Sequence, residues 1–356
     1  MHGSTYSQYA SNPEYDVTGN SYPKTGDLSP EGIKEMYKLG QEFRKDYIEE
    51  QHFLSSKFDP NSIFLESIKD QPGLMSAYAF MLGVYPDSTS YLNLRMDNAQ
   101  EHQKLVRKTL GLSENPARGS KKVPVSTDEG FLYWSNPARM CPAIHKKVQS
   151  MISSASESVK DEYKKNLFPH LATSFGKSKS SINFITAHKY LDDYLVAKRT
   201  GNKYPKFPNQ KSIDKLIEEY EKDYFYEGMV GGNELSRVIA TPLINYALVN
   251  TFTKSQDTKG NLRDAKIHSL KHSHFLLNEI GFVAFLKALG HPQSTAPKGS
   301  QNLRIELFEA SKKHFVSISL DGKPLNFADS NHGIFELDSF LKTIYPAMYF
   351  GDVDKV

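Results

Sequence analysis

A short apolar segment, residues 74–82, constrains the fold of this chain more than any other stretch of the sequence. It contains no Gly or Pro, and its small and apolar side chains cover nearly every side, which predicts a buried helix. Gly83 and Pro86 then end the helix. The preceding residues 62–67 form an apolar run of strand length with a polar end. A strand with a polar exit before a buried helix is typical of α/β enzymes, which place their sites at that edge of the sheet.

The composition indicates an ordinary globular protein. The 356 residues suffice for two domains or for one elaborated domain. The net charge of +3, without an arginine-rich stripe, argues against nucleic acid as a partner. No apolar run approaches the roughly 20 residues of a membrane helix. Cys141 is the only cysteine, so we expect a reducing compartment. Residues 1–6 lack the features of a secretory signal, so we expect an intracellular protein that is not secreted.

The periodicity along the chain predicts strands towards both ends and helices in the middle. Ser29 and Pro30 start a helix that runs to about residue 50. Residues 87–122 are polar and weakly periodic, and we interpret them as an excursion from the core. The other predicted elements are helices at 143–152, 156–167, 182–198, 213–226, 235–252, 280–289 and 336–345, a strand at 268–277, and a β-hairpin at 303–310 and 314–320. We therefore predict an α/β core of residues 1–86 and 257–356. Residues 87–256 would form a mostly helical cap that includes core-flanking helices.

Two clusters of residues are candidates for a metal site and a nucleotide site. His268, His272 and His274 lie close in sequence, but no carboxylate stands at a ligand spacing beside them. A solvated strand or loop is the favoured interpretation, and a metal site is the alternative. The glycines of residues 228–232 neither follow a strand nor precede the Lys-Ser/Thr of a phosphate loop. We expect no cofactor and no metal.

Segments along the whole chain resemble the histidine acid phosphatases. They are Gly26-Asp27-Leu28-Ser29, Glu66-Ser67, Leu74-Met75-Ser76-Ala77, Cys141-Pro142, residues 277–289 and residues 304–320. The resemblance implies a phosphoglycerate-mutase-like α/β sandwich with an inserted α-helical cap. In that family a central β-strand precedes the first motif, and it is missing from this sequence. We expect that the true start lies upstream or that another element, such as a partner chain, fills the gap.

The resemblance also implies a phosphohistidine mechanism. The family's Arg-His-Gly-x-Arg-x-Pro motif supplies a nucleophilic His and two Arg, and a third Arg follows at the exit of the next strand. A later His-Asp pair supplies another phosphate contact and the proton donor. The His attacks phosphorus, the Arg side chains neutralise the phosphate, and the Asp protonates the leaving alcohol.

The chain departs from the family at the first motif. His2 and Gly3 match it, but Met1, Thr5 and Ser7 stand where the two Arg and the Pro belong. The motif therefore keeps its nucleophile and loses its cations.

Later positions depart as well. Glu66 stands at the strand-exit Arg, Pro72 at a later Arg of the same loop, and Asn278 and Glu279 at the His-Asp pair. A Glu66 carboxylate close to the phosphate would cost about 4 kcal/mol in like-charge repulsion. Each lost cationic donor would cost roughly 1.5–3 kcal/mol. For three lost donors this predicts about ten kcal/mol less stabilisation of a phosphate ester. We therefore expect no catalytic residue, and a vestigial pocket formed by His2, Thr5, Glu66, Asn278 and Glu279.

These departures favour a non-catalytic function. The main hypothesis is a pseudophosphatase that acts as a structural or accessory subunit of a larger assembly, for which a mitochondrial inner-membrane complex, respiratory or ATP-synthesising, is suggested. Its expected partners are other protein subunits, with peripheral association with a membrane complex. One alternative is an active but atypical acid phosphatase that hydrolyses phosphate monoesters through His2. A second is a binding module in which Glu66 and Glu279 flank a cation or an amine.

Overall fold

The structure is a computed structural model of the chain. It describes residues 1–6, 26–93, 99–127, 142–157, 159–200, 204–256, 269–291 and 296–351. Ser7, Cys141 and His268, which entered the sequence predictions, lie outside the described residues.

Two helices near the start of the chain form the centre of the α/β part. α1 (Pro30–Arg44) begins after Ser29, whose hydroxyl oxygen accepts a hydrogen bond from the Gly32 N–H, as the sequence predicted. It continues into a short π-helix, η1 (Lys45–Glu50). α2 (Gln71–Val84) is the predicted buried helix, and its side chains are buried over most of its length. The segment that most constrained the sequence therefore lies in the core.

Glycines let these two helices approach closely. A Cβ on Gly40 of α1 would lie 2.2 Å from the Phe80 carbonyl oxygen, and a Cβ on Gly83 of α2 would lie 2.2 Å from the Tyr37 carbonyl oxygen. No side chain fits at either position, so glycine is required for this helix pair.

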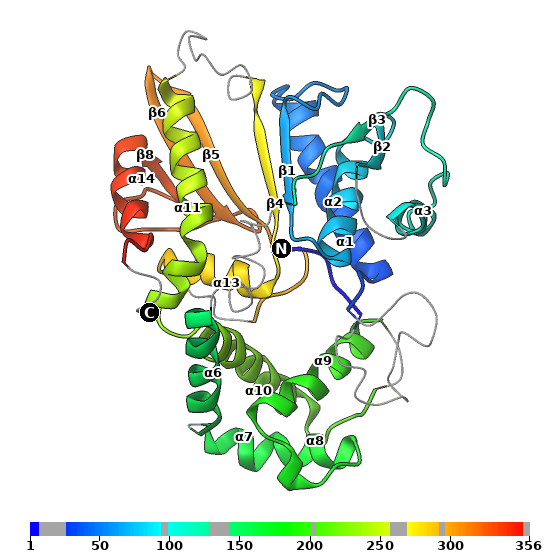
Figure 1. The fold of residues 1–356 in the computed structure, drawn as a ribbon, viewed down its shortest axis with the longest axis vertical. Helices are drawn as coiled ribbons and strands as arrows, with labels where there is room; N and C mark the ends of the chain where they lie inside the picture. Colours follow the sequence, from blue (N-terminus) through cyan, green and yellow to red (C-terminus); the bar gives the residue numbers. More distant parts are fainter. Residues whose placement is uncertain are drawn as a thin grey trace.

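A parallel pair of strands lies beside α2 (Figure 1). β1 (Ile63–Ser67) pairs with β4 (His272–Leu276), so that Ile63 lies opposite His272 and Ser67 opposite Leu276. Both predicted strands are confirmed, although β4 is shorter than the predicted range 268–277. The carboxyl ends of the two strands meet at one edge, where α2 and α13 (Glu279–Ala288) begin.

The second sheet is antiparallel and carries the predicted hairpin. Its strands are β5 (Leu303–Ala310), β6 (Lys313–Leu320), β7 (Lys323–Pro324) and β8 (Ile334–Glu336). α11 (Asn233–Gln256) runs along this sheet and α14 (Leu337–Ile344) follows β8 (Figure 1). Ile244 of α11, Val316 of β6 and Phe340 of α14 lie in one buried cluster. This sheet and its helices therefore form one layered unit.

The predicted helical cap lies on one side of the α/β part (Figure 1). Its helices are α6 (Pro142–Glu157), α7 (Asp161–Asn166), α8 (Phe168–Ser174), α9 (Phe184–Thr200) and α10 (Gln210–Asp223), followed by the π-helix η4 (Tyr224–Met229). Tyr163, Tyr194 and Tyr220 are fully buried in a cluster that belongs to the cap alone. The boundaries predicted for the cap stay a prediction.

The polar stretch 87–122 is more ordered than the sequence indicated. It forms β2 (Thr89–Leu92) and α3 (Ala99–Thr109), and β3 (Lys121–Val123) pairs with β2. Leu92, Val106 and Val123 join the same buried cluster as α2. Three such short elements each bury few apolar residues, so their periodicity was too weak to detect.

A groove separates the two sheets. Among the described residues, β4 pairs only with β1 along the strand, and β5 pairs only with β6. A pocket lined by residues of both strands lies between β4 and β5.

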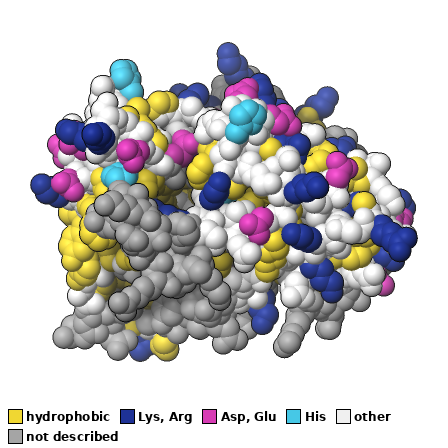
Figure 2. Space-filling model, turned by 90° about the horizontal axis from the view of Figure 1, so that it is seen from above, with side chains coloured by type: hydrophobic (Ala, Val, Ile, Leu, Met, Phe, Trp, Pro, Cys, Tyr) yellow, Lys and Arg dark blue, Asp and Glu magenta, His cyan; other side chains and the backbone are white. Residues whose placement is uncertain are grey.

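The outer surface of the molecule is mixed in charge. Figure 2 shows Lys and Arg side chains spread over one face with Asp and Glu among them. No described helix combines the length and the apolar character that crossing a membrane requires.

Candidate active site

The loop that carries His2 is held by backbone contacts on several sides. The His2 N–H donates to the Leu277 carbonyl oxygen at 2.9 Å, just after β4. The Gly3 N–H donates to the Ser76 hydroxyl oxygen of α2 at 3.0 Å. A Cβ on Gly3 would lie 2.5 Å from the Gly32 carbonyl oxygen of α1. The loop is thereby fixed where α1, α2 and α13 begin, and only glycine fits at position 3.

The side chain of His2 is buried and oriented by its own loop. Its Nδ1 atom lies 2.8 Å from the Gly3 carbonyl oxygen, which can only accept, so we assign the ring proton there to Nδ1. The other ring nitrogen, Nε2, lies 3.6 Å from Oε2 of Glu279. The two residues that the resemblance placed in one pocket are therefore neighbours.

His2 and Glu279 form a charge pair. Burial alone would lower the pKa of His2, but the charge and hydrogen bond of Glu279 outweigh it and raise that pKa to about 9. Burial alone would raise the pKa of Glu279, but His2 outweighs it and lowers that pKa to about 2. The pair therefore holds one proton over a wide range of pH.

Asp70 is a member of this site that the sequence analysis missed. Its carboxylate caps α2 by accepting from the Gly73 N–H at 2.8 Å, and its charge helps to raise the pKa of His2. Asp70 is a helix-capping residue that follows the polar end of β1 by a few positions, and this pattern could have identified it in the sequence. Pro72 lies in the first turn of the same helix, where its missing N–H costs nothing.

Asn278 and Thr5 have structural contacts at the site. The Asn278 side chain caps α13 by accepting from the Gly281 N–H at 2.9 Å. Thr5 forms an isolated antiparallel bridge with Leu28. Both residues stabilise the frame around His2.

Glu66 lies in different surroundings from Glu279. It is buried on β1 opposite Phe275, and its charge acts on Tyr246 of α11, whose pKa is raised mainly by burial and also by Glu66. The charged side chains that act most on His2 are Glu279 and Asp70. That Glu66 and Glu279 lie on either side of one ligand stays a prediction.

The cap brings cationic and titratable groups to the site. Arg199 of α9 donates through a guanidinium nitrogen to the Thr5 carbonyl oxygen at 3.2 Å. His188 of the same helix lies 3.0 Å from Oε1 of Glu221. Burial would lower the pKa of His188, but Glu221 raises it and Glu279 adds to the effect. No pattern in the sequence indicated that α9 faces the His2 loop, because this contact depends on how the cap packs.

The histidines on β4 are not a solvated strand, which corrects the favoured interpretation. His272 packs 4.5 Å from the Phe43 ring centre, and His274 stacks on Phe80 at 4.0 Å. Burial lowers the pKa of both rings, that of His272 to about 4. Within the described part of the chain, no group of three or more His, Cys, Asp or Glu side chains could hold a metal ion.

Comparisons with known proteins show the family to which the chain belongs. A family model described as the histidine phosphatase superfamily, branch 2, matches residues 4–316. Human lysophosphatidic acid phosphatase type 6 is 22% identical over 326 residues, which cover 90% of this chain and 66% of that protein. A Caenorhabditis elegans protein named as an acid phosphatase is 36% identical over 61 residues, which cover 17% of this chain and 14% of that protein. The chain thus spans less than two thirds of the length of either relative.

Solved structures share the fold. The phytase of Hafnia alvei in complex with myo-inositol hexakis sulphate has a TM-score of 0.60 at 15% identity and covers 98% of this chain and 95% of its own. The phytase of Citrobacter braakii has a TM-score of 0.59 at 15% identity and covers 98% of this chain and 96% of its own. The predicted α/β sandwich with a helical cap is confirmed.

The prediction of a non-catalytic accessory subunit is wrong, because the relatives and fold neighbours are named phosphatases and phytases. Its reasoning counted no cation from the cap, whereas Arg199 contacts the His2 loop.

Proposed function

Because the chain belongs to branch 2 of the histidine phosphatase superfamily, we propose that it hydrolyses phosphate monoesters with His2 as the nucleophile. The observation that carries the proposal is the orientation of the His2 ring. Its Nδ1 proton is held by the Gly3 carbonyl oxygen, so Nε2 is the nitrogen that faces Glu279. A nucleophilic histidine needs this arrangement, in which one nitrogen is anchored and the other is directed at the substrate.

The shared proton of His2 and Glu279 fits both halves of the reaction. When it moves from Nε2 to Glu279, the imidazole becomes neutral and its lone pair can attack phosphorus. The bond from phosphorus to the ester oxygen breaks, and Glu279 gives that proton to the leaving oxygen. In the second half, Glu279 takes a proton from water, the hydroxide attacks the phosphohistidine, and the bond from phosphorus to Nε2 breaks. Phosphate leaves and the original pair is restored.

Positive potential for the phosphate comes from the elements around the loop. α13 begins at the site after the uncharged cap Asn278, and helix N-termini favour anions, whereas the carboxylate of Asp70 already caps α2. Arg199 adds a guanidinium from the cap, bonded to the loop at Thr5. We assign Arg199 the charge-neutralising role that Thr5 and Pro72 cannot fill.

Substrates named for the relatives set the first panel. Purified protein should be assayed with an aryl phosphate, a lysophosphatidic acid and an inositol hexakisphosphate, by release of inorganic phosphate. We expect turnover of at least one, and a loss of at least ~10³-fold in His2→Ala, because the covalent route is then closed. His314→Ala, on β6, removes a histidine without touching the site and should keep full activity. If the intact protein turns over no better than His2→Ala on every substrate, the proposal fails.

A further inference from the structure

A carboxylate of α1 holds the segment that carries His2. The Ser4 N–H donates to Oε2 of Glu35 at 3.0 Å, and the Ser4 hydroxyl donates to Oε1 of the same carboxylate at 3.0 Å. Ser4 offers two donors and Glu35 offers two acceptor oxygens, so each donor has its own acceptor. Hydrogen bonds to a charged carboxylate are roughly twice as strong as those between neutral groups. Glu35 therefore fixes Ser4 at two points.

The backbone on either side of these bonds lies close to Ser4. Gly32 stands three positions before Glu35 on the same face of α1, and a Cβ there would lie 2.7 Å from the Ser4 nitrogen. A Cβ on Gly299 would lie 2.6 Å from that nitrogen and 2.5 Å from the Ser4 hydroxyl oxygen. Ser4 is accordingly buried. The two Ser4 atoms that donate to Glu35 are therefore packed tightly as well as hydrogen-bonded.

The peptide group between Gly3 and Ser4 links Glu35 to the ring of His2. Its N–H is the Ser4 donor that Glu35 accepts, at 3.0 Å. Its carbonyl oxygen belongs to Gly3 and lies 2.8 Å from Nδ1 of His2. A peptide group is planar, so its N–H and its C=O turn together. The side chain that fixes the N–H thus also fixes the carbonyl oxygen that orients the ring.

We propose that Glu35 is a positioning residue for His2, which sets the orientation of the ring by holding the Gly3–Ser4 peptide group. With this group fixed, Nδ1 stays on the Gly3 carbonyl oxygen and Nε2 stays directed at Glu279, 3.6 Å away. A turned peptide group would withdraw the carbonyl oxygen and free the ring to change rotamer. The effect on catalysis rests on the proposed function, whereas the effect on the ring does not.

Three replacements of Glu35 separate the contact from the charge. Glu35→Gln keeps the contact without the charge, because its amide oxygen can accept from the Ser4 N–H and its NH₂ group can donate to the Ser4 hydroxyl oxygen. Glu35→Asp keeps the charge on a side chain one CH₂ group shorter, which no longer reaches Ser4. Glu35→Ala removes both.

The first measurement is steady-state kinetics of the full chain with an ester that it hydrolyses. Displacing a nucleophile by about 1 Å costs on the order of 10²-fold. We expect kcat to fall about 10–100-fold in Glu35→Asp and Glu35→Ala, with KM within about twofold because the phosphate contacts remain. In Glu35→Gln, kcat should stay within about threefold.

The matched control is Glu42→Ala, which should leave kcat unchanged. Glu42 lies on the same helix, where its exposed carboxylate pairs with Lys38 at 3.8 Å. If Glu35→Ala does not fold, the comparison of Glu35→Asp with Glu35→Gln decides. An unchanged kcat in Glu35→Asp overturns the proposal. An equal loss in Glu35→Gln and Glu35→Ala overturns it too, because the charge and not the contact would then matter.

The second measurement follows the His2 ring by NMR and needs no substrate. The pKa of His2 is raised to about 9 mainly by Glu279, so a ring that turns away from Glu279 should titrate closer to pH 6.5. We expect this fall in Glu35→Asp and Glu35→Ala and none in Glu35→Gln. Equal pKa values of His2 in all four proteins overturn the proposal. If the intact protein hydrolyses no ester better than His2→Ala, the proposed function fails, and the pKa of the ring still decides the role of Glu35.

Discussion

His2 is buried and His272 is half-buried in the α/β part, yet the pKa values of their rings are shifted in opposite directions. Burial lowers the pKa of each ring. Beside His2, the carboxylate of Glu279 outweighs burial and raises the pKa to about 9. Beside His272, the nearby charge is that of Arg304, which adds to burial and lowers the pKa to about 4. The charged neighbour, more than the depth of burial, decides which histidine holds a proton.

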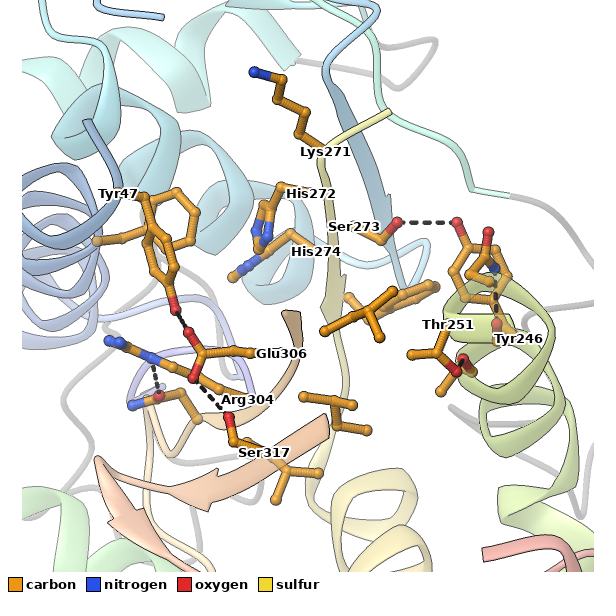
Figure 3. Close-up of a pocket in the computed structure, with 18 of the residues that line it drawn as sticks. Tyr47, Tyr246, Thr251, Lys271, His272, Ser273, His274, Arg304, Glu306 and Ser317 are labelled. Atoms are coloured by element: carbon orange, nitrogen blue, oxygen red, sulfur yellow. Dashed lines mark hydrogen bonds between the residues drawn. The ribbon is translucent and has the colours of Figure 1, made fainter. Parts of the chain in front are cut away.

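The difference between the pKa of His2 and that of His272 indicates different roles for the two regions of the molecule. The His2 pocket stores a proton between two titratable groups, which suits proton transfer during hydrolysis. The rings of His272 and His274, on one side of β4 (Figure 3), stay neutral at physiological pH and pack on Phe43 and Phe80, which suits a structural role.

Replacing Glu279 with Gln should remove the difference between the two regions. The His2 ring would lose the carboxylate that holds its proton, so its pKa should fall to 6.5 or below, as followed by NMR of the ring. Loss of the proton donor should lower kcat by about 10²–10⁴-fold. The control is Glu309→Gln, because Glu309 forms an exposed pair with His314 at 3.9 Å. An unchanged kcat in Glu279→Gln would contradict the assigned role.

Stability should depend on pH through the same pair. The pKa of His2 is raised, so its stabilisation is complete below about pH 6.5 and is lost as the pH rises through about 9. The pKa of Glu279 is lowered, so the stabilisation is complete above about pH 4.5 and is lost as the pH falls towards 2. The interaction is counted once and amounts to on the order of 3 kcal/mol. Urea unfolding at pH 5.5 and pH 9.5 measures it. If the free energy of unfolding changes by the same amount between pH 5.5 and pH 9.5 in Glu279→Gln, then groups other than this pair cause the change.

Arg199→Gln should weaken substrate binding with little change in the chemical step. One charge-assisted hydrogen bond is worth roughly 1.5–3 kcal/mol, so KM should rise at least tenfold while kcat changes less than about threefold. The matched control is Lys198→Gln on the same helix, because the Lys198 ammonium pairs with Asp214 at 2.8 Å. Equal KM values in the two variants would remove Arg199 from the phosphate site.

His274→Phe should have the smallest effect. The ring is neutral and stacks on Phe80 at 4.0 Å, so a phenyl ring preserves the contact. We expect kcat/KM within about twofold of the unchanged protein. A loss of more than tenfold would show that the groove histidines take part in the chemistry.

The sequence predicted the fold of this molecule better than the function of its candidate site. The strand before α2, the buried helix and the hairpin follow from periodicity and turn residues, which act over short distances. The resemblance placed His2 beside Glu279 although 276 positions lie between them. It did so because a known fold shows which distant residues meet, and the periodicity of a single sequence does not. That the protein lies in a reducing compartment or in mitochondria, and that it works beside other subunits, stays a prediction.

The missed residues depend on packing between distant segments. Asp70 carries a local capping signal and could have been found. Arg199 could not, because the contact with Thr5 exists only after the cap folds over the loop.

The contact of Gly3 with Gly32 has a consequence for how the site works. A Cβ on Gly32 would lie 2.1 Å from the Ser4 carbonyl oxygen, so the His2 loop rests on α1 backbone to backbone. No side chain lies between them that could change rotamer and let the loop shift. A phosphoryl group would thus arrive at and depart from a rigid support, and substrates of different size would have to be accommodated by movement of the cap. On the proposed function, the hydrogen bond from Arg199 of α9 to Thr5 would have to break when the cap moves.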